Sequence, residues 1–331
     1  MRRAAASKIA SKAEPREPIS IGGNTVRAGT SQTIEIPVAR LPPGTWTAMP
    51  VVALHGSRPG RSVWLSGAIH GDELNGVEIV RRLLGQLQPG NMAGTVLAVP
   101  IVNVFGVTTA SRYLPDGRDL NRSFPGSRRG SLASQLASLF FENVAVRCDF
   151  GLDFHTGARG RSNLPHVRCD LDDPLTRELA EAFSPRLVLH ASLRDGSLRA
   201  AACRRGGRVL LYEGGEADRF DEVAIALGVE GALRVLHSLG MIDEAPRAPA
   251  TPVPCARKSR WIRAGRSGFC HTRVELGDSV VQGQRIVSIS DSMGGKELDI
   301  RARVAGVVIG LLRTALVHRG DALVHIAEVE A

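Results

Sequence analysis

The chain has 331 residues, of which 43% are hydrophobic, and this is enough to bury the core of one large domain and a smaller one. The formal net charge of +9 could indicate nucleic-acid binding, but the basic residues are scattered and aromatic residues make up only 4%. We therefore expect a small anionic partner and no nucleic acid, with solvated surface charge as the alternative explanation. Arg, Gly or Asp interrupts each apolar run before the roughly 20 residues that a membrane helix needs, so we expect no membrane partner.

Residues 1–28 begin with a basic stretch that lacks the apolar core of a secretory signal, so we expect a solvated N-terminal tail. The five cysteines are an odd number and include no CxxC pair, which argues against a disulfide framework and against a thiolate zinc site. Both features favour a cytoplasmic protein with reduced thiols.

Short β-rich runs alternate with longer helical patterns between residues 29 and 243, which predicts an α/β domain with helices packed on the faces of a sheet. The expected strands, in chain order, cover residues 33–38, 49–54, 62–68, 95–99, 150–155, 186–190 and 208–213. The expected helices cover residues 74–87, 132–147, 174–182 and 218–239.

The proline-rich residues 244–255 are expected to form an extended linker between two domains. From residue 256 to residue 331, turns that contain glycine separate alternating apolar and polar residues. This pattern predicts a small all-β domain with a barrel-like or sandwich arrangement. The exposed strand edges of such a domain would allow pairing between subunits, so a homo-oligomer is possible.

The run HGDE lies between an expected strand and an expected helix, and it places His70 three residues before Glu73. At this spacing an imidazole nitrogen and a carboxylate can converge on one metal ion. An HxxE pair also occurs by chance, with the glutamate solvated near the start of a helix. The pair becomes informative only together with further ligand residues.

Two further runs end expected strands with polar side chains, GLDFHTG with His155 and LLYEGG with Glu213. Two histidines and one carboxylate form the ligand set of a catalytic zinc ion, which keeps its fourth position for water. Glu213 would then act as the general base toward that water. The alternatives are a histidine bonded to the backbone and a glutamate in a surface salt bridge.

The run SRYLPDGRDLNRSFPG places polar and cationic residues in a long loop between two expected elements. Arg122 offers a planar fork that matches a carboxylate, and Asn121 adds a neutral donor, so the two could hold an acidic substrate. Either Arg112 or Arg118 could supply positive charge where the oxyanion of the reaction develops. A solvated loop arginine is the alternative for both.

The ordered motifs HGDE, DLNRSFPG, DFHTG and YEGG, followed by a β-rich C-terminal region, resemble the succinylglutamate desuccinylase and aspartoacylase family of the zinc carboxypeptidase superfamily. The resemblance covers nearly the whole chain after about residue 20. It implies a zinc-carboxypeptidase-like mixed sheet with helices on both faces, and a barrel-sandwich-like C-terminal domain that partly covers the cleft. It also implies hydrolysis of the amide bond of an N-acyl amino acid or related N-acyl amine, with one zinc ion per chain.

The resemblance assigns a role to each motif position. The implied zinc ligands are His70, Glu73 and His155. Glu213 matches the base and proton shuttle of the family. The two carboxylates should therefore fail differently when they are replaced, because only one of them holds the metal.

The same resemblance covers four positions of the long loop. Asn121 and Arg122 match the pair that binds the substrate carboxylate, and Asp119 matches a carboxylate that orients a metal-bound histidine. Arg112 resembles the arginine that polarises the scissile carbonyl. The chain has extra residues between Arg112 and Asn121 compared with aspartoacylase, so Arg118 stays open for this role.

Three other functions remain open from the sequence. A zinc carboxypeptidase would use the same metal and base on peptides. The C-terminal region resembles biotinyl and lipoyl carriers, in which Lys296 would be the attachment point, but the flanking methionines of a biotin site are missing. A catalytically silent binding protein with the same fold is the third alternative.

Overall fold

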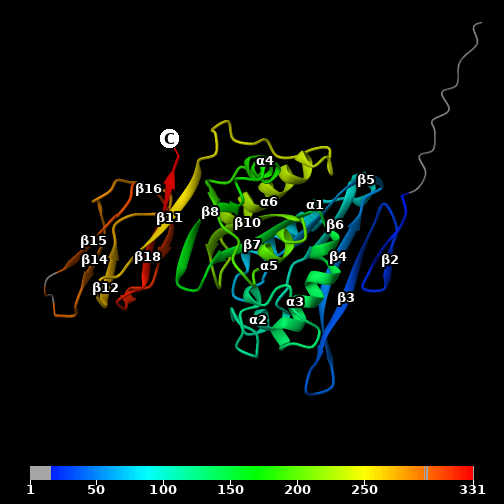
Figure 1. Ribbon diagram of the computed structural model, residues 1–331, viewed down its shortest axis with the longest axis horizontal. Helices are drawn as coiled ribbons and strands as arrows, with labels where there is room; N and C mark the ends of the chain where they lie inside the picture. Colours follow the sequence, from blue (N-terminus) through cyan, green and yellow to red (C-terminus); the bar gives the residue numbers. More distant parts are fainter. Residues whose placement is uncertain (1–15, 294, 296, 331) are drawn as a thin grey trace, which may run out of the picture.

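The computed structural model describes residues 16–293, 295 and 297–330, which form a broad α/β body and a β-rich lobe at the C-terminal end (Figure 1). The strands are β1 (Ile19–Ile21), β2 (Asn24–Val26), β3 (Thr30–Arg40), β4 (Trp46–His55), β5 (Arg58–Ser66), β6 (Ala93–Val99), β7 (Phe150–Gly157), β8 (Arg161–Cys169), β9 (Val188–His190), β10 (Arg208–Glu216), β11 (Cys255–Arg263), β12 (Gly268–Thr272), β13 (Ser279–Val280), β14 (Arg285–Ser290), β15 (Leu298–Arg301), β16 (Gly306–Leu312), β17 (Leu316–Val317) and β18 (Ala322–Val329). The α-helices are α1 (Asn75–Gln86), α2 (Val104–Thr108), α3 (Leu132–Asn143), α4 (Pro174–Phe183), α5 (Leu198–Cys203) and α6 (Glu222–Ser238).

A mixed sheet runs through the α/β body. Its central strands follow the order β10-β7-β5-β6, and all three neighbouring pairs are parallel. β4 and β3 continue the sheet antiparallel on one side, and β8 joins β10 antiparallel on the other. Because β5, β7 and β10 are parallel, their carboxyl ends meet at one edge, where α/β proteins place their sites.

Helices cover both faces of this sheet (Figure 1). On one face α1, α4 and α6 pack on strand residues such as Phe154 and Tyr212. On the other face α3 and α5 pack on residues such as Trp64 and Leu97. Neighbouring residues of one strand contribute to opposite cores, because side chains alternate between the faces of a strand. The expected mixed α/β fold with helices on both faces is confirmed.

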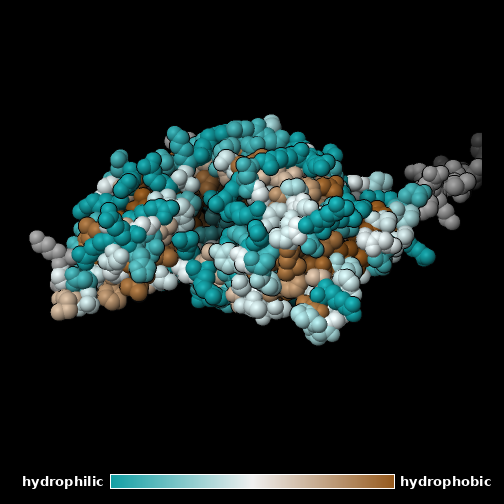
Figure 2. Space-filling view, turned by 60° about the horizontal axis from the view of Figure 1, so that its bottom comes forward, coloured by the Kyte–Doolittle hydropathy of each residue, from teal (hydrophilic) through white to brown (hydrophobic). Residues whose placement is uncertain are grey.

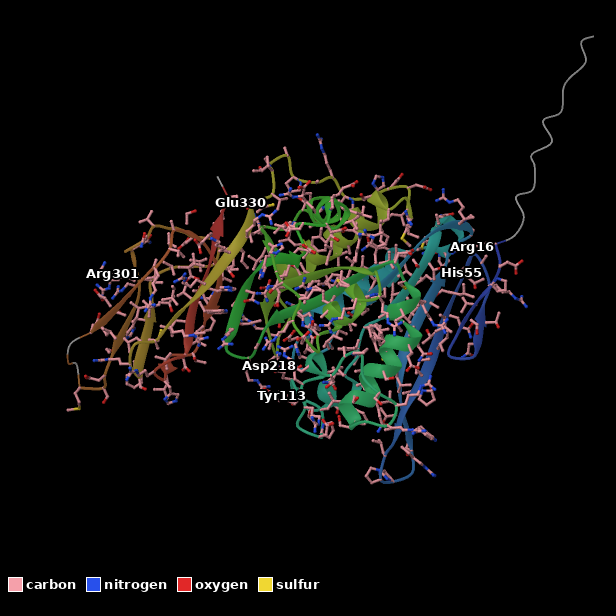
Figure 3. The ribbon with its side chains drawn as sticks, viewed as in Figure 1. Arg16, His55, Tyr113, Asp218, Arg301 and Glu330 are labelled. Carbon is pink, nitrogen blue, oxygen red and sulfur yellow. The ribbon has the colours of Figure 1, made fainter. Side chains whose placement is uncertain are left out.

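The prediction of a solvated N-terminal tail over residues 1–28 is wrong for residues 16–28. β1 and β2 form an antiparallel hairpin whose Ile21 and Val26 are buried in the core. The guanidinium of Arg16 donates to the carbonyl of Gly94 at 2.6 Å, close to His55 (Figure 3). Apolar residues spaced along two three-residue strands give too weak a pattern to be recognised before their packing partners are known.

The C-terminal strands continue the large sheet instead of standing apart. β11 pairs parallel with β9, β18 pairs with β11, and β16 pairs with both β18 and β8. The pairings therefore close a ring of five strands, β8-β9-β11-β18-β16. This ring joins strands that lie before the expected linker in the sequence to strands that lie after it. Of the other C-terminal strands, β13 pairs with β16, and the rest form a four-stranded sheet in the order β15-β14-β12-β17. The apolar residues of this small sheet share one core with those of β11, β16 and β18. The division of the chain into domains stays a prediction.

Among the residues that the structure describes, no helix is both long and apolar enough to cross a membrane.

Candidate active site

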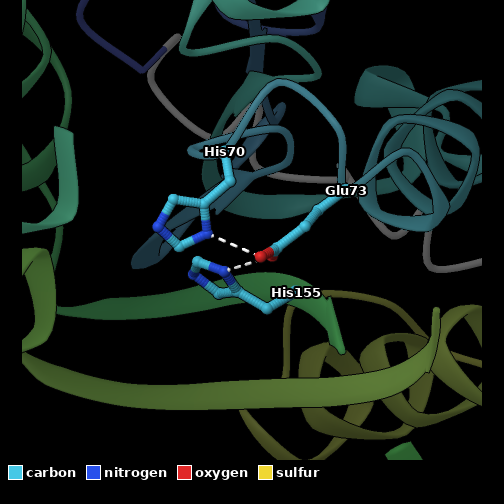
Figure 4. Close-up of side chains that lie close together, drawn as sticks. All are labelled: His70, Glu73 and His155. Carbon is cyan, nitrogen blue, oxygen red and sulfur yellow. Dashed lines mark hydrogen bonds and ion pairs between the residues drawn. The ribbon is translucent and has the colours of Figure 1, made fainter. Parts of the chain in front are cut away.

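His70 and Glu73 lie in the turn between β5 and α1, at the carboxyl edge of the sheet. The backbone N–H of Glu73 donates to the carbonyl of His70 at 3.1 Å, and this tight turn brings both side chains together. Nδ1 of His70 lies 2.7 Å from Oε1 of Glu73 (Figure 4). Both side chains are buried.

His155 reaches the same point from β7, the parallel neighbour of β5. Its Nδ1 lies 2.8 Å from Oε2 of Glu73, so the two imidazoles approach the two oxygens of one carboxylate (Figure 4). One ligand atom from each of His70, Glu73 and His155 lies within 4.8 Å of the others. The structure thus brings together the three residues that the sequence indicated as metal ligands.

A second carboxylate holds the far nitrogen of each imidazole. Nε2 of His70 lies 3.2 Å from Oδ1 of Asp119, and Nε2 of His155 lies 3.0 Å from Oδ2 of Asp153. Each carboxylate favours the tautomer with the proton on Nε2, which leaves the lone pair of Nδ1 for a metal.

The chemistry of this donor set fits zinc. Two imidazole nitrogens and one carboxylate are ligands that zinc accepts, and three protein ligands leave a fourth position open. The paired carboxylates on both Nε2 atoms are the arrangement that raises ligand basicity around zinc. His70, Glu73 and His155 are therefore candidate ligands of one ion.

Arg112 joins this cluster from the loop after α2. It donates to Oε1 of Glu73 at 3.2 Å and to Oδ2 of Asp119 at 3.0 Å. Burial alone would raise the pKa of Asp119, but His70 and Arg112 outweigh it and hold the pKa well below its usual range. Arg118 is exposed and lies outside the lining of the cleft. The position of Arg112 therefore suits the carbonyl-polarising role better.

Glu213 lies on β10 directly beside His155 in the register of the parallel pair β10 and β7. Asn163 donates through Nδ2 to Oε2 of Glu213 at 2.9 Å, and Arg168 lies 3.7 Å from Oε1. Burial raises the pKa of the Glu213 carboxyl, while the charge of Arg168 opposes this. A largely buried carboxylate with a raised pKa can accept a proton near neutral pH.

Asn121 and Arg122 belong to the short 3-10 helix η2 (Leu120–Arg122), which Asp119 caps. Oδ1 of Asn121 accepts a hydrogen bond from the backbone N–H of Leu198 at 2.9 Å. The guanidinium of Arg122 donates a hydrogen bond to the carbonyl of Asn121, and both residues line the cleft. Both side chains therefore line the same cleft as the candidate metal ligands.

The three candidate metal ligands, Arg112, Glu213 and the pair Asn121 and Arg122 line one cleft of about 1080 Å³ between the α/β body and the C-terminal strands. Figure 2 shows the surface hollowed between these two parts, with hydrophilic side chains around the hollow. Eight arginine or lysine side chains line the cleft, against the two glutamates Glu73 and Glu213. The cleft is therefore strongly cationic, which favours anionic ligands.

The family model for the succinylglutamate desuccinylase/aspartoacylase catalytic domain matches residues 59–239, the segment that carries the whole cluster. The chain belongs to this family. An N-alpha-acetyl-L-2,4-diaminobutyric acid deacetylase of Halomonas elongata is 30% identical over 283 residues, 82% of this chain and 83% of the relative. A succinylglutamate desuccinylase of Yersinia pestis is 27% identical over 190 residues, 53% of this chain and 56% of the relative. The chain thus spans about half the length of that desuccinylase.

Solved structures are similar to this chain over nearly its whole length. A succinylglutamate desuccinylase/aspartoacylase from Rhodobacter sphaeroides has a TM-score of 0.83 at 25% identity, over 98% of this chain and 100% of the other. The product-bound ectoine utilization protein EutE (DoeB) from Ruegeria pomeroyi has a TM-score of 0.83 at 22% identity, over 94% and 99%. The second likeness shows the shared fold alone.

The sequence analysis missed three side chains of the site. Asp153 carried a usable signal, because residues two apart on a strand share a face and Asp153 precedes His155 by two. Asn163 and Arg168 lie on β8, a segment in which no strand was expected. Only the tertiary structure brings these two side chains to Glu213.

Proposed function

We propose that this protein is a zinc-dependent deacylase that hydrolyses the amide bond of an N-acyl amino acid or a related N-acyl amine. One observation carries the proposal. His70, Glu73 and His155 converge at the sheet edge where Glu213, a largely buried carboxylate with a raised pKa, lies next to His155. A metal-ligand set beside a largely buried base is the arrangement expected for hydrolysis.

When bound by His70, Glu73 and His155, one zinc ion would supply Lewis-acid chemistry, polarising the carbonyl and lowering the pKa of a water toward about 7. Glu213 accepts the proton of the attacking water and delivers it to the nitrogen of the leaving amine, so that the carboxylate is regenerated. Arg112 provides positive charge near the developing oxyanion. Asp119 and Asp153 keep the two imidazoles oriented.

The substrate class follows from the cleft and from the relatives. Asn121 and Arg122 would hold a carboxylate of the substrate, and the cationic lining supports an anionic molecule. The names of the two curated relatives describe removal of an acetyl and a succinyl group. Both names support an N-acyl amino acid as the substrate, with the acyl group and the amine left open.

The remaining parts of the proposal concern the whole protein. We propose that the C-terminal strands form a barrel-sandwich domain that covers the cleft and excludes long peptides. This distinguishes the deacylase from a zinc carboxypeptidase, which needs a cleft open to peptides. The carrier alternative depends on Lys296, which lies outside the described residues. Cytoplasmic location and a homo-oligomeric state stay predictions.

Replacement of Glu213 by Gln tests the mechanism. The substitution keeps the size of the side chain but removes the base, so kcat should fall by about 10²–10⁴ while zinc stays bound. The measurement combines steady-state kinetics on a panel of N-acyl amino acids with the zinc content of the purified protein. Glu73→Gln is the matched variant, because it should lose zinc as well as activity.

Two results would contradict the proposal. Full turnover by Glu213→Gln would remove this residue as the base. Faster hydrolysis of blocked peptides than of N-acyl amino acids by the wild-type protein would favour the carboxypeptidase instead.

A further inference from the structure

A row of residues connects the candidate base to the C-terminal strands. Gly215, two residues after Glu213 on β10, is the cross-strand partner of Asn163 on β8. Asn163 is in turn the partner of Gly310 on β16, and Gly310 is the partner of His325 on β18. His325 pairs with Trp261 on β11. The row thus crosses five strands, and three of them belong to the C-terminal part of the chain.

The side chains of this row are tightly packed. The rings of Trp261 and His325 are stacked, with centroids 4.5 Å apart and an interplanar angle of 11°. A β-carbon on Gly310 would lie 3.1 Å from Oδ1 of Asn163, 3.1 Å from Cβ of His325 and 3.2 Å from the indole of Trp261. Gly310 therefore provides the space in which the indole and the carboxamide lie side by side. Oδ1 of Asn163 faces this packed surface.

The other end of the same carboxamide faces the base. Nδ2 of Asn163 donates to Oε2 of Glu213 at 2.9 Å, whereas Oε1 lies 3.7 Å from Arg168. A hydrogen bond to a charged carboxylate fixes its orientation more strongly than one between neutral groups. Arg161, whose guanidinium carbon lies 5.4 Å from the ring centroid of Trp261, holds the indole from the side of β8.

We propose that Asn163 is a positioning residue for Glu213, and that the C-terminal strands hold Asn163 in place through Gly310, His325 and Trp261. The C-terminal part of the chain then does more than cover the cleft, because it keeps one oxygen of the base in a fixed direction. The inference rests on the proposed function of Glu213 as the base.

Kinetics of Asn163 variants test this role. Asn163→Ala removes the donor, and Asn163→Asp keeps the size but places a second carboxylate beside Glu213. Each variant should lower kcat by about 10- to 100-fold, the usual effect of losing a hydrogen bond to a charged group. KM and the zinc content should stay within about twofold, because a positioning residue acts on the base and not on binding. A rise in KM at unchanged kcat would make Asn163 a substrate-binding residue and overturn the proposal.

A double-mutant cycle separates positioning from a general structural effect. In the Glu213→Gln background, Asn163→Ala should cause no further loss of kcat, because the group that it positions no longer acts as a base. If the double variant instead lost kcat by the product of the two single fold-losses, the proposal would be overturned. Gly310→Ala should lower kcat about 3- to 10-fold by displacing the carboxamide, since the added methyl group has no free space. Gly90→Ala is its control, because Gly90 is exposed and a β-carbon there meets nothing within 4 Å.

Crystal structures of Asn163→Ala and Gly310→Ala give an answer that does not depend on turnover. The carboxylate of Glu213 should be displaced or occupy several orientations in both variants. An unchanged, well-ordered Glu213 would overturn the positioning role even if the wild-type protein hydrolyses N-acyl amino acids. A wild-type protein without deacylase activity would instead contradict the proposed function, while the crystal structures still decide the role of Asn163.

Discussion

At the level of single residues, both ring nitrogens of each candidate histidine ligand lie within hydrogen-bond distance of a carboxylate. Glu73 faces Nδ1 of both histidines, while Asp119 and Asp153 each hold an Nε2. Asp153 is itself fixed by the hydroxyl of Ser66, which donates to its Oδ1 at 2.6 Å. The imidazoles thus have their direction and tautomer set by the fold, and an ion would not need to reorganise them.

Asp153→Asn and Asp119→Asn should each weaken zinc binding by about 10- to 100-fold, because the neutral amide no longer favours the ligand tautomer. The zinc dissociation constant, measured by competition with a chelator at constant pH, checks this expectation. Asp243→Asn serves as the control, since Asp243 is exposed and paired with Arg58 far from the cluster. An unchanged dissociation constant in both variants would show that these carboxylates do not act on the ligands.

At the level of elements, close packing between β5 and β7 aligns the strands that carry the site. Gly151 of β7 is the register partner of Trp64 of β5. A β-carbon on Gly151 would lie 2.0 Å from the indole of Trp64. The indole is buried and meets Phe140 of α3 edge-on, with ring centroids 5.9 Å apart. The indole of Trp64 therefore cannot move away from a larger side chain at position 151 without disturbing the core.

Gly151→Ala should lower the free energy of unfolding by about 1–3 kcal/mol, because the added methyl group overpacks the core. Urea denaturation measures the change. Gly85→Ala is the matched control on the exposed side of α1, where a β-carbon meets nothing within 4 Å. That variant should gain about 0.5–1 kcal/mol from helix propensity. Equal stability of the wild type and Gly151→Ala would mean that β5 and β7 can adjust their spacing.

The elements that the sequence predicted are those with a strong local pattern, and the ones it missed have none. β7 and α1 appear at nearly the expected residues because their apolar residues follow strand and helix spacing. β8 was missed because Pro165 interrupts it and its cleft-facing residues, among them Asn163 and Arg168, are polar. The six-residue helix α5 is too short for a helical pattern to be recognised.

At the level of the whole molecule, two buried histidines lie where the α/β body meets the C-terminal strands. Burial, together with the charge of Arg168, lowers the pKa of His166 and of His325 to about 3. In the unfolded chain a histidine titrates near pH 6.5, so between about pH 6.5 and pH 3 the unfolded state binds more protons. The stabilising effect of these neutral histidines is complete above about pH 6.5 and is lost as the pH falls.

The dependence of stability on pH should therefore become weaker in His325→Gln. Between about pH 6 and pH 4, the slope of the unfolding free energy against pH should decrease by up to about 1.4 kcal/mol per pH unit, the equivalent of one proton. Urea denaturation at a series of pH values measures the slope. His271→Gln, at an exposed position of β12, is the matched control for the substitution itself. A wild-type slope in His325→Gln would show that His325 becomes protonated without unfolding.

The sequence by itself determined the α/β class and the residues of the candidate metal-ligand cluster. The reason is that both depend on local patterns, namely apolar spacing and polar side chains at strand ends, where parallel strands meet at one edge. The β1–β2 hairpin, the pairing of Asp153 with His155 and the continuation of the sheet into the C-terminal strands were decided only by the tertiary structure. The contact between Asn163 and Glu213 joins residues 50 positions apart, and no local pattern encodes which distant side chain meets the candidate base.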